Sequence, residues 1–389
     1  MGFVAKKRKP NKSNKTINNV GAGITMFILG TIALFWSEGN FVRTVGAINE
    51  ARSALVKVDD VSSLNADLEG KLIHGAAKAF TDDVFSDDLF GVSVNAIYLY
   101  RSVQYYQMTE RRSETGSGGR RSVNYYYEEK WADNPVNSSD FHKEQYSSTN
   151  FVITNIDELY QESENVKWGA YQLPEFLIET IVDKTTATIR LSEQNRAALE
   201  SRSPNASVHV SDNEVYFGAD PSSPAIGDVR ITVTYTPPGV DFSLIAQVQG
   251  NTFIPFTSEN GIEFWSSDNG IVSAEQMFED ELGSDAMMTW IIRVVGILFI
   301  IGGLRAIFVI IPKLSNSIPL FGSIANAGLG FACIVLGVVW SSLIIAIVWL
   351  LYRPLIAVIF IVIAGAGIFF LIKRAKARRL SADESVLST

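Results

Sequence analysis

Three histidines, His74, His142 and His209, are the side chains of this sequence best suited to acid–base or metal chemistry. None of them has a second His or Cys at the spacing of a zinc site. No Gly-x-Ser-x-Gly elbow, Walker loop or dinucleotide-binding fingerprint accompanies them. His74 lies in a strand-like segment, which favours a structural role over a catalytic one. The sequence therefore predicts no catalytic residues, no cofactor and no metal site, and a protein that is not an enzyme.

Two pairs of neighbouring carboxylates, Asp82-Asp83 and Asp87-Asp88, are the next candidates for a site. Carboxylate oxygens are the ligands that Ca²⁺ and Mg²⁺ prefer, so the pairs could hold a divalent cation weakly. The ligand spacing of an EF-hand does not accompany them. We therefore favour a solvated acidic loop over a cation site.

Tyrosines are concentrated at Tyr105-Tyr106 and at Tyr125-Tyr126-Tyr127. If the two segments are neighbouring strands, the rings can form a cross-strand aromatic ladder. They can also form a surface for a partner protein, because aromatic residues are enriched at interfaces. We expect a ladder on one face of this strand pair and assign no role to its other face.

Charge is distributed very unevenly along the 389 residues, whose formal net charge is −8. Residues 1–39 carry six Lys/Arg and one acidic residue, and residues 286–389 carry nine and two. Residues 40–285 carry 18 Lys/Arg and 38 Asp/Glu. Basic clusters beside apolar segments mark the cytoplasmic side of a membrane. An acidic central region would repel a nucleic acid, so we expect no nucleic-acid partner.

Four long apolar runs match the thickness of a bilayer and predict a membrane α-helical protein with four transmembrane helices. The first run, 20–36, has no small-x-small cleavage site after it, which favours an uncleaved anchor over a signal peptide. The only cysteine, Cys333, lies in the third run. We expect basic cytoplasmic tails at 1–19 and 373–389, and transmembrane helices at 20–37, 286–311, 321–351 and 354–372. Both termini then lie in the cytoplasm, with 38–285 across the membrane.

Five residues are expected at the membrane interfaces, namely Trp36, Trp290, Arg293, Arg305 and Arg353. Arg293 and Arg305 belong to the same predicted helix and lie about 18 Å apart along it. Each can therefore snorkel to a different interface. No Asp or Glu lies within any apolar run. We therefore expect neither arginine to have a counter-ion inside the membrane, which argues against a proton relay.

Residues 38–285 are expected to form a large, acidic, β-rich α+β domain. Segments 96–110 and 122–131 are rich in Tyr and β-branched residues and flank a Gly-rich loop, which predicts a long hairpin. Four further strands are expected, at 208–217, 228–235, 243–248 and 252–256. Helical or mixed segments are expected at 55–64 and 173–182. A capping box at Ser273 and Gln276 predicts the start of the helix that leads into the second span.

Several short segments, taken in order and with their spacing, resemble the LUMA (transmembrane protein 43) family almost from end to end. They are Glu38-Gly39, Glu69-Gly70-Lys71-Leu72-Ile73-His74, Tyr106-Gln107-Met108 with Glu110, Tyr127-Glu128-Glu129-Lys130-Trp131, Gly227-Asp228-Val229-Arg230, Ile254-Pro255-Phe256, Ser273-Ala274-Glu275-Gln276-Met277-Phe278, Met288-Thr289-Trp290 with Arg293, and Tyr352-Arg353-Pro354. The resemblance implies a self-associating multipass protein with a large lumenal domain that organises other membrane proteins. It implies the endoplasmic reticulum or inner nuclear membrane, or the inner membrane for a bacterial member. It brings no catalytic residues.

Our first hypothesis is a non-enzymatic membrane scaffold that self-associates and acts on membrane lipids or other membrane proteins through its lumenal or periplasmic domain. An oligomeric channel or transporter is the alternative, since an acidic outer domain can concentrate cations at a pore mouth. An enzyme that acts on lipid or envelope polymer is a third possibility. It would need His74 or the acidic pairs, Asp82-Asp83 and Asp87-Asp88, as acid or base.

Overall fold

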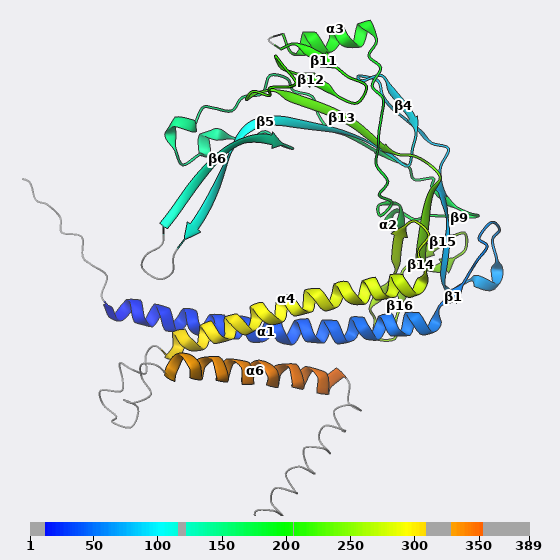
Figure 1. The fold of residues 1–389 in the computed structure, drawn as a ribbon. Helices are drawn as coiled ribbons and strands as arrows, with labels where there is room; N and C mark the ends of the chain where they lie inside the picture. The colour runs from blue at the N-terminus through cyan, green and yellow to red at the C-terminus, as the bar shows by residue number, and fades with distance from the viewer. Residues whose placement is uncertain (1–11, 116–121, 205, 309–327, 353–389) are drawn as a thin grey trace, which may run out of the picture. The chain divides into compact units, whose positions relative to one another are not determined.

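The computed structural model describes residues 12–115, 122–204, 206–308 and 328–352. Within these residues the chain divides into two compact units (Figure 1). A helical unit is formed by residues up to 53, by 257–264 and by the residues from 278 onward. A β unit is formed by 54–256 and 265–277. The predicted order, one apolar helix before a large β-rich domain and further apolar helices after it, is confirmed. The predicted fourth helix, 354–372, and the C-terminal tail lie outside the described residues.

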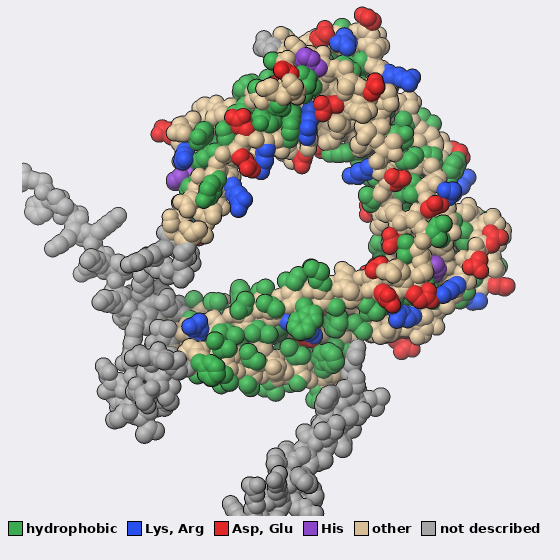
Figure 2. Space-filling model, in the orientation of Figure 1, with side chains coloured by type: hydrophobic (Ala, Val, Ile, Leu, Met, Phe, Trp, Pro, Cys, Tyr) green, Lys and Arg blue, Asp and Glu red, His purple; other side chains and the backbone are tan. Residues whose placement is uncertain are grey.

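Three helices of the helical unit are long and apolar enough to cross a membrane. They are α1 (Lys12–Ala54), α4 (Ala274–Phe308) and α6 (Gly328–Tyr352). At 43 residues, α1 is about 64 Å long, roughly twice the hydrocarbon thickness of a bilayer. It therefore continues well past the predicted span at 20–37. Figure 2 shows hydrophobic side chains over much of the visible surface of these helices, as expected for helices that face lipid.

Glycines bring α1 and α4 into close antiparallel contact. A Cβ on Gly30 would lie 2.8 Å from the carbonyl oxygen of Gly296, and a Cβ on Gly303 would lie 2.6 Å from that of Gly23. Gly23 and Gly30 are seven residues apart on α1, and Gly296 and Gly303 are seven residues apart on α4. Seven residues are about two helical turns, so the glycines repeat on one face of each helix. Small residues of this kind let membrane helices approach closely, because lipid provides no hydrophobic drive for association.

The third helix packs parallel to α1 and also contacts α4. Its buried residues recur every three or four positions and so form one stripe: Cys333, Gly337, Ser341, Ile344 and Val348. Each helix contributes one buried residue to a small apolar core, formed by Leu34, Ile300 and Ile344. A short hairpin, β16 (Phe256–Thr257) with β17 (Glu263–Phe264), adjoins the helices.

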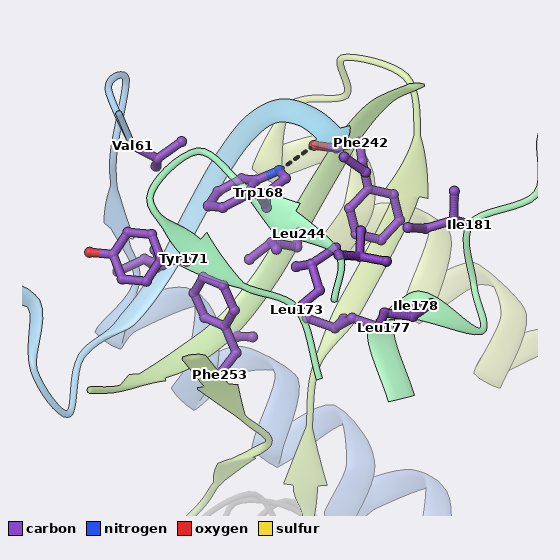
Figure 3. Packing of buried hydrophobic residues seen from close by; sticks show 14 of the residues in the cluster. Val61, Trp168, Tyr171, Leu173, Leu177, Ile178, Ile181, Phe242, Leu244 and Phe253 are labelled. Atoms are coloured by element: carbon purple, nitrogen blue, oxygen red, sulfur yellow. Dashed lines mark hydrogen bonds between the residues drawn. The ribbon is translucent and has the colours of Figure 1, made fainter. Parts of the chain in front are cut away.

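The first sheet of the β unit has the order β15-β14-β2-β8-β9, with β1 beside β2 and β18 beside β14. Its strands are β1 (Val56–Lys57), β2 (Leu72–Phe80), β8 (Lys167–Trp168), β9 (Tyr171–Gln172), β14 (Val240–Gln249), β15 (Thr252–Ile254) and β18 (Ser266–Asn269). Trp168, Tyr171 and Phe253 lie at the centre of its core (Figure 3). The indole N–H of Trp168 donates to the carbonyl oxygen of Phe242 at 2.9 Å, so the buried ring keeps a hydrogen-bond partner.

The second sheet has the order β11-β12-β13-β5-β6, with β10 beside β13 and β7 beside β5. Its strands are β5 (Tyr98–Thr115), β6 (Ser122–Ala132), β7 (Leu159–Glu162), β10 (Thr185–Thr186), β11 (Val208–Val210), β12 (Val215–Phe217) and β13 (Val229–Thr236). The predicted long hairpin is therefore confirmed as β5 and β6. The single strand predicted at 208–217 is wrong, because a turn closed by Ser211 and Glu214 divides it into two.

The expected tyrosine ladder does not form, because the hairpin register separates the two tyrosine groups. Tyr106 is opposite Trp131, whereas Tyr127 is opposite Glu110. Tyr106 makes an edge contact with Trp131, with ring centroids 5.3 Å apart. Tyr127 instead stacks on Tyr146, which belongs to the segment that follows the hairpin.

Smaller elements complete the β unit. They are the hairpin of β3 (Val84–Asp87) and β4 (Val92–Asn95), the helices α2 (Glu175–Ile178) and α3 (Glu193–Arg202), and 3₁₀ turns at Ala66–Leu68, Ser138–Asp140 and Glu144–Tyr146. Segments 55–64 and 173–182 contain only a two-residue strand and a one-turn helix, in line with the mixed structure expected there. Helix α3 was not predicted from the sequence, although Ser192 caps it by accepting from the Asn195 amide at 3.1 Å.

Candidate functional site: a polar cluster between the membrane helices

Three polar side chains, one from each described membrane helix, form a cluster. They are Glu38 of α1, Arg293 of α4 and Trp349 of α6. Arg293 of α4 donates two hydrogen bonds to the Glu38 carboxylate, from Nε to Oε1 and from Nη2 to Oε2, the second at 2.8 Å. The indole N–H of Trp349 on α6 donates to Oε2 of Glu38 at 3.1 Å. The cluster therefore connects positions separated by up to 311 residues in the sequence.

Burial makes this cluster energetically important. The Glu38 side chain is 0% exposed and the Arg293 side chain is 15% exposed. A carboxylate removed from water is very costly unless a cation and hydrogen bonds compensate it. The arginine fork compensates the charge with two parallel hydrogen bonds. The guanidinium also lies 4.9 Å from the ring centre of Trp290 and 6.0 Å from that of Phe41, within the range of cation–π attraction.

Arg293 corrects one expectation from the sequence. We expected it to snorkel to the interface without a counter-ion inside the membrane, but it forms an ion pair with Glu38. The acid lies just beyond the first apolar run, at a point where α1 continues as a helix. The lack of Asp and Glu within the runs therefore did not show that a counter-ion is missing.

The other expected interface residues are distributed as follows. Trp36 and Trp290 are 65% and 61% exposed and belong to the helices that carry Glu38 and Arg293. Arg305 is also exposed, towards the far end of α4. Arg353 lies outside the described residues. The structure thus brings Trp290 and Arg293 together, and the interface assignments stay predictions.

Some functional candidates were not predicted from the sequence. They are Glu38, Trp349 and the glycines that join α1 to α4. Glu38 had a usable signal, since no proline ends the helix after Trp36, and a helix that continues keeps Glu38 within one turn of the apolar run. The seven-residue spacing of Gly23 with Gly30, and of Gly296 with Gly303, was a second signal. Trp349 had none, because a tryptophan near the end of a span is ordinary.

The three histidines lie in separate parts of the β unit. His74 is on β2, and its Nε2 lies 2.9 Å from the carbonyl oxygen of Val272. His142 stacks on Tyr125 with ring centroids 4.0 Å apart. His209 is on β11, and its Nε2 lies 3.2 Å from the Gly218 carbonyl oxygen. Among the described residues, no three His, Cys, Asp or Glu side chains are grouped so that they could hold a metal ion.

Asp87 is not part of a solvated loop, which corrects the interpretation of the acidic pairs. Its side chain is 2% exposed, and Nη1 of Arg101 donates to both of its carboxylate oxygens at 2.9 Å. Asp83 accepts a hydrogen bond from Ser163 at 2.7 Å. Asp82 and Asp88 are exposed. One acid of each pair therefore stabilises the fold.

A further buried acid, Asp228, pairs with the hydroxyl of Tyr216. Asp228 is 7% exposed and also accepts from the Ala225 amide at 2.8 Å. Burial, followed by the hydrogen bond to Asp228, raises the pKa of Tyr216 well above its usual value. Tyr216 therefore stays protonated and keeps donating to the carboxylate at any ordinary pH.

The sequence profile of the family described as Transmembrane protein 43 matches residues 104–354. This match covers more than half of the chain. The chain belongs to this family. It is 27% identical to human Transmembrane protein 43 over 380 residues, which cover 94% of this chain and 92% of the human protein. It is 25% identical to the Transmembrane protein 43 homolog of Drosophila melanogaster over 362 residues, 89% of this chain and 91% of the fly protein. No solved structure matches the chain.

Family membership supports the expected resemblance and a multipass membrane protein. Glu38 and Arg293 of the polar cluster both belong to segments that carry the resemblance to this family. A charged pair of this kind can lock helices together. It leaves little scope for proton or ion transfer, since each carboxylate oxygen of Glu38 already accepts from a donor.

Proposed function

We propose that this protein is a non-enzymatic multipass membrane scaffold, which self-associates and organises membrane proteins or lipids through its β unit. The observation that carries the proposal concerns the segments that resemble the Transmembrane protein 43 family, called here the family-like segments. Their polar residues make contacts that stabilise the fold. Enzymes instead gather such groups at a cleft with perturbed proton affinities.

Four of these contacts connect different segments of the β unit. Glu69 accepts from the Gly250 amide at 2.8 Å. The Tyr127 hydroxyl donates to Glu110 across the β5–β6 hairpin. The other two are Arg230 over the ring of Trp131, at 4.3 Å from its centre, and the pairing of Tyr216 with Asp228. Such groups give the β unit a defined shape, which is what a scaffold needs.

The edge strand β6 is the surface that we assign to partner contact. Among the described residues β6 pairs only with β5, so one edge of an 11-residue strand faces away from the sheet. Tyr126 on this strand is 58% exposed. An open strand edge can accept a strand of another chain by main-chain hydrogen bonding, and an exposed tyrosine provides specificity.

The polar cluster supports a scaffold over the channel alternative. The buried Glu38 carboxylate is neutralised by Arg293, so it offers no vacant acidic site for a cation between these helices. We further propose that both termini are cytoplasmic and that the β unit is lumenal or periplasmic, in the endoplasmic reticulum and inner nuclear membrane or in a bacterial inner membrane. Protease protection of tagged termini in sealed vesicles tests this orientation.

The scaffold proposal is tested with the full chain in native-membrane nanodiscs, by mass photometry combined with crosslinking mass spectrometry. We expect a defined oligomer and recurrent crosslinks from residues 54–256. Tyr126→Ser should weaken these crosslinks at least about threefold, whereas Tyr160→Ser, at a tyrosine that is also 58% exposed, should leave them unchanged. A monomer without recurrent partners would contradict the proposal.

A further inference from the structure

A groove on the outer surface of the helical unit lies between α1 and the end of α6. Its volume is about 410 Å³, and it is lined chiefly by Ile32, Phe35, Trp36, Asn40, Arg43 and Tyr352. This volume is within the range of sites that bind small molecules. None of the three side chains of the polar cluster lines it, so it is a separate feature of the helices.

The lining changes from apolar to polar along the axis of α1. Ile32 and Phe35 lie at one end and are 58% and 41% exposed. Asn40 and Arg43 lie towards the other end, about 12 Å and about 17 Å from Ile32 along the helix. Trp36 and Tyr352 lie between them, and such amphipathic rings are typical of the level where lipid headgroups begin. The groove therefore has the same polarity gradient as a phospholipid in a bilayer leaflet.

Two family-like segments form the wall of the groove. Gly39 is buried beneath the ring of Tyr352, and a Cβ added there would lie 3.2 Å from that ring. The absence of a side chain at Gly39 lets Tyr352 lie against α1. Arg43 is held by Asn260, whose side-chain amide donates to the Arg43 carbonyl oxygen at 2.8 Å while Arg43 Nη2 donates to the Asn260 carbonyl oxygen at 3.2 Å.

We propose that this groove binds one phospholipid of the leaflet nearer the C-terminal end of α1, with an acyl chain against Ile32 and Phe35 and the phosphate at Arg43. The inference deepens the proposed function by naming a lipid ligand. It rests on that function only for the insertion of α1 and α6 into a bilayer. A guanidinium has five N–H donors, and Arg43 uses one of them on Asn260, so others are available for phosphate oxygens.

Photocrosslinking of the full-length protein after purification in detergent tests the proposal. The photoreactive residue p-benzoylphenylalanine is placed at Ile32, and the α1 peptide is analysed by mass spectrometry for a phospholipid adduct. Ile28 is the matched control, because it lies one turn earlier, is 49% exposed and does not line the groove. We expect at least about a fivefold higher lipid adduct at position 32, since detergent removes lipid that is not specifically held.

Variants of Arg43 test the phosphate contact. Arg43→Gln should lower the adduct at position 32 at least about fivefold, while Arg43→Lys should retain most of it because the charge is kept. Asn260→Ala removes the amide contact to Arg43 and should also retain the adduct. Equal yields at positions 28 and 32, or an adduct to protein of the same or a second chain, would overturn the proposal. Absence of the phospholipid adduct at position 32 in a protein that still forms its oligomer would refute the lipid site but not the proposed scaffold function.

Discussion

Arg293 forms an ion pair with Glu38, a residue 255 positions earlier in the chain, and the acid is completely buried. The two residues lie on antiparallel helices that are also joined by two glycine contacts, Gly30 with Gly296 and Gly23 with Gly303. The glycines permit close approach, and the ion pair fixes the register. Each feature explains why the other can form.

Removing one partner of the ion pair should destabilise the helical unit strongly. Glu38→Met or Arg293→Met leaves an uncompensated charge, and we expect each to lower the free energy of unfolding by about 3 kcal/mol. The lower end of the usual range applies because Arg293 is partly exposed. The double variant should recover most of this loss, since two apolar side chains leave no charge behind. Thermal unfolding in nanodiscs measures all three, with Arg305→Met as the exposed control.

Trp349→Phe should be more costly than Trp340→Phe, although both changes remove one indole donor. Trp349 donates to the charged Glu38, whereas Trp340 donates to the neutral hydroxyl of Thr31 at 3.1 Å. Hydrogen bonds to charged groups contribute about 1.5–3 kcal/mol and neutral ones about 1 kcal/mol. Equal losses in chemical unfolding experiments would show that the Glu38 carboxylate is not the group that gives Trp349 its importance.

Alanine at two glycines of α4 should have effects of opposite sign. A Cβ at Gly303 would lie 2.6 Å from the Gly23 carbonyl oxygen, so Gly303→Ala must separate the helices and should cost about 1–3 kcal/mol. A Cβ at Gly283 would meet no atom within 4 Å, so Gly283→Ala should stabilise α4 by up to about 1 kcal/mol. Calorimetric midpoints of the two variants give the comparison. Two stabilised variants would be incompatible with the observed helix contact.

The β unit should lose stability at alkaline pH through Tyr216. Its pKa is raised by burial and by the hydrogen bond to Asp228, so the protonated form is favoured in the folded state. The stabilisation is complete below the ordinary tyrosine pKa near 10 and is lost as pH rises through the higher folded value. Tyr216→Phe should remove that part of the pH dependence while costing about 1–3 kcal/mol at neutral pH, because Asp228 loses a buried donor.

Exposed tyrosines provide the control for that experiment. Burial and the hydrogen bond to Glu162 raise the pKa of Tyr160 to about 12. Tyr160→Phe should therefore change the pH dependence of stability less than Tyr216→Phe does, since the Tyr160 side chain is largely exposed. Absorbance at alkaline pH follows tyrosine ionisation, and circular dichroism follows unfolding. An alkaline transition that is unchanged in Tyr216→Phe would contradict the assignment.

Local patterns predicted the β5–β6 hairpin and the helix start after Ser273 because turn residues, β-branched residues and caps act over a few positions. Ser273 Oγ accepts from the Gln276 amide at 3.3 Å, in agreement with the predicted N-cap. The register of the hairpin was not predictable in the same way. Six residues separate the two strands, and a connection of that length does not determine which tyrosine is opposite which residue.

The sequence by itself determined that apolar helices precede and follow a β-rich domain, because hydrocarbon thickness sets a minimum length of apolar chain that is visible in any sequence. Only the tertiary structure decided how distant polar residues combine. Glu38, Arg293 and Trp349 come from three helices, and Asp87 finds Arg101 on another strand. Such pairs form because a buried charge must be compensated wherever the chain brings it, and local sequence carries no record of that partner.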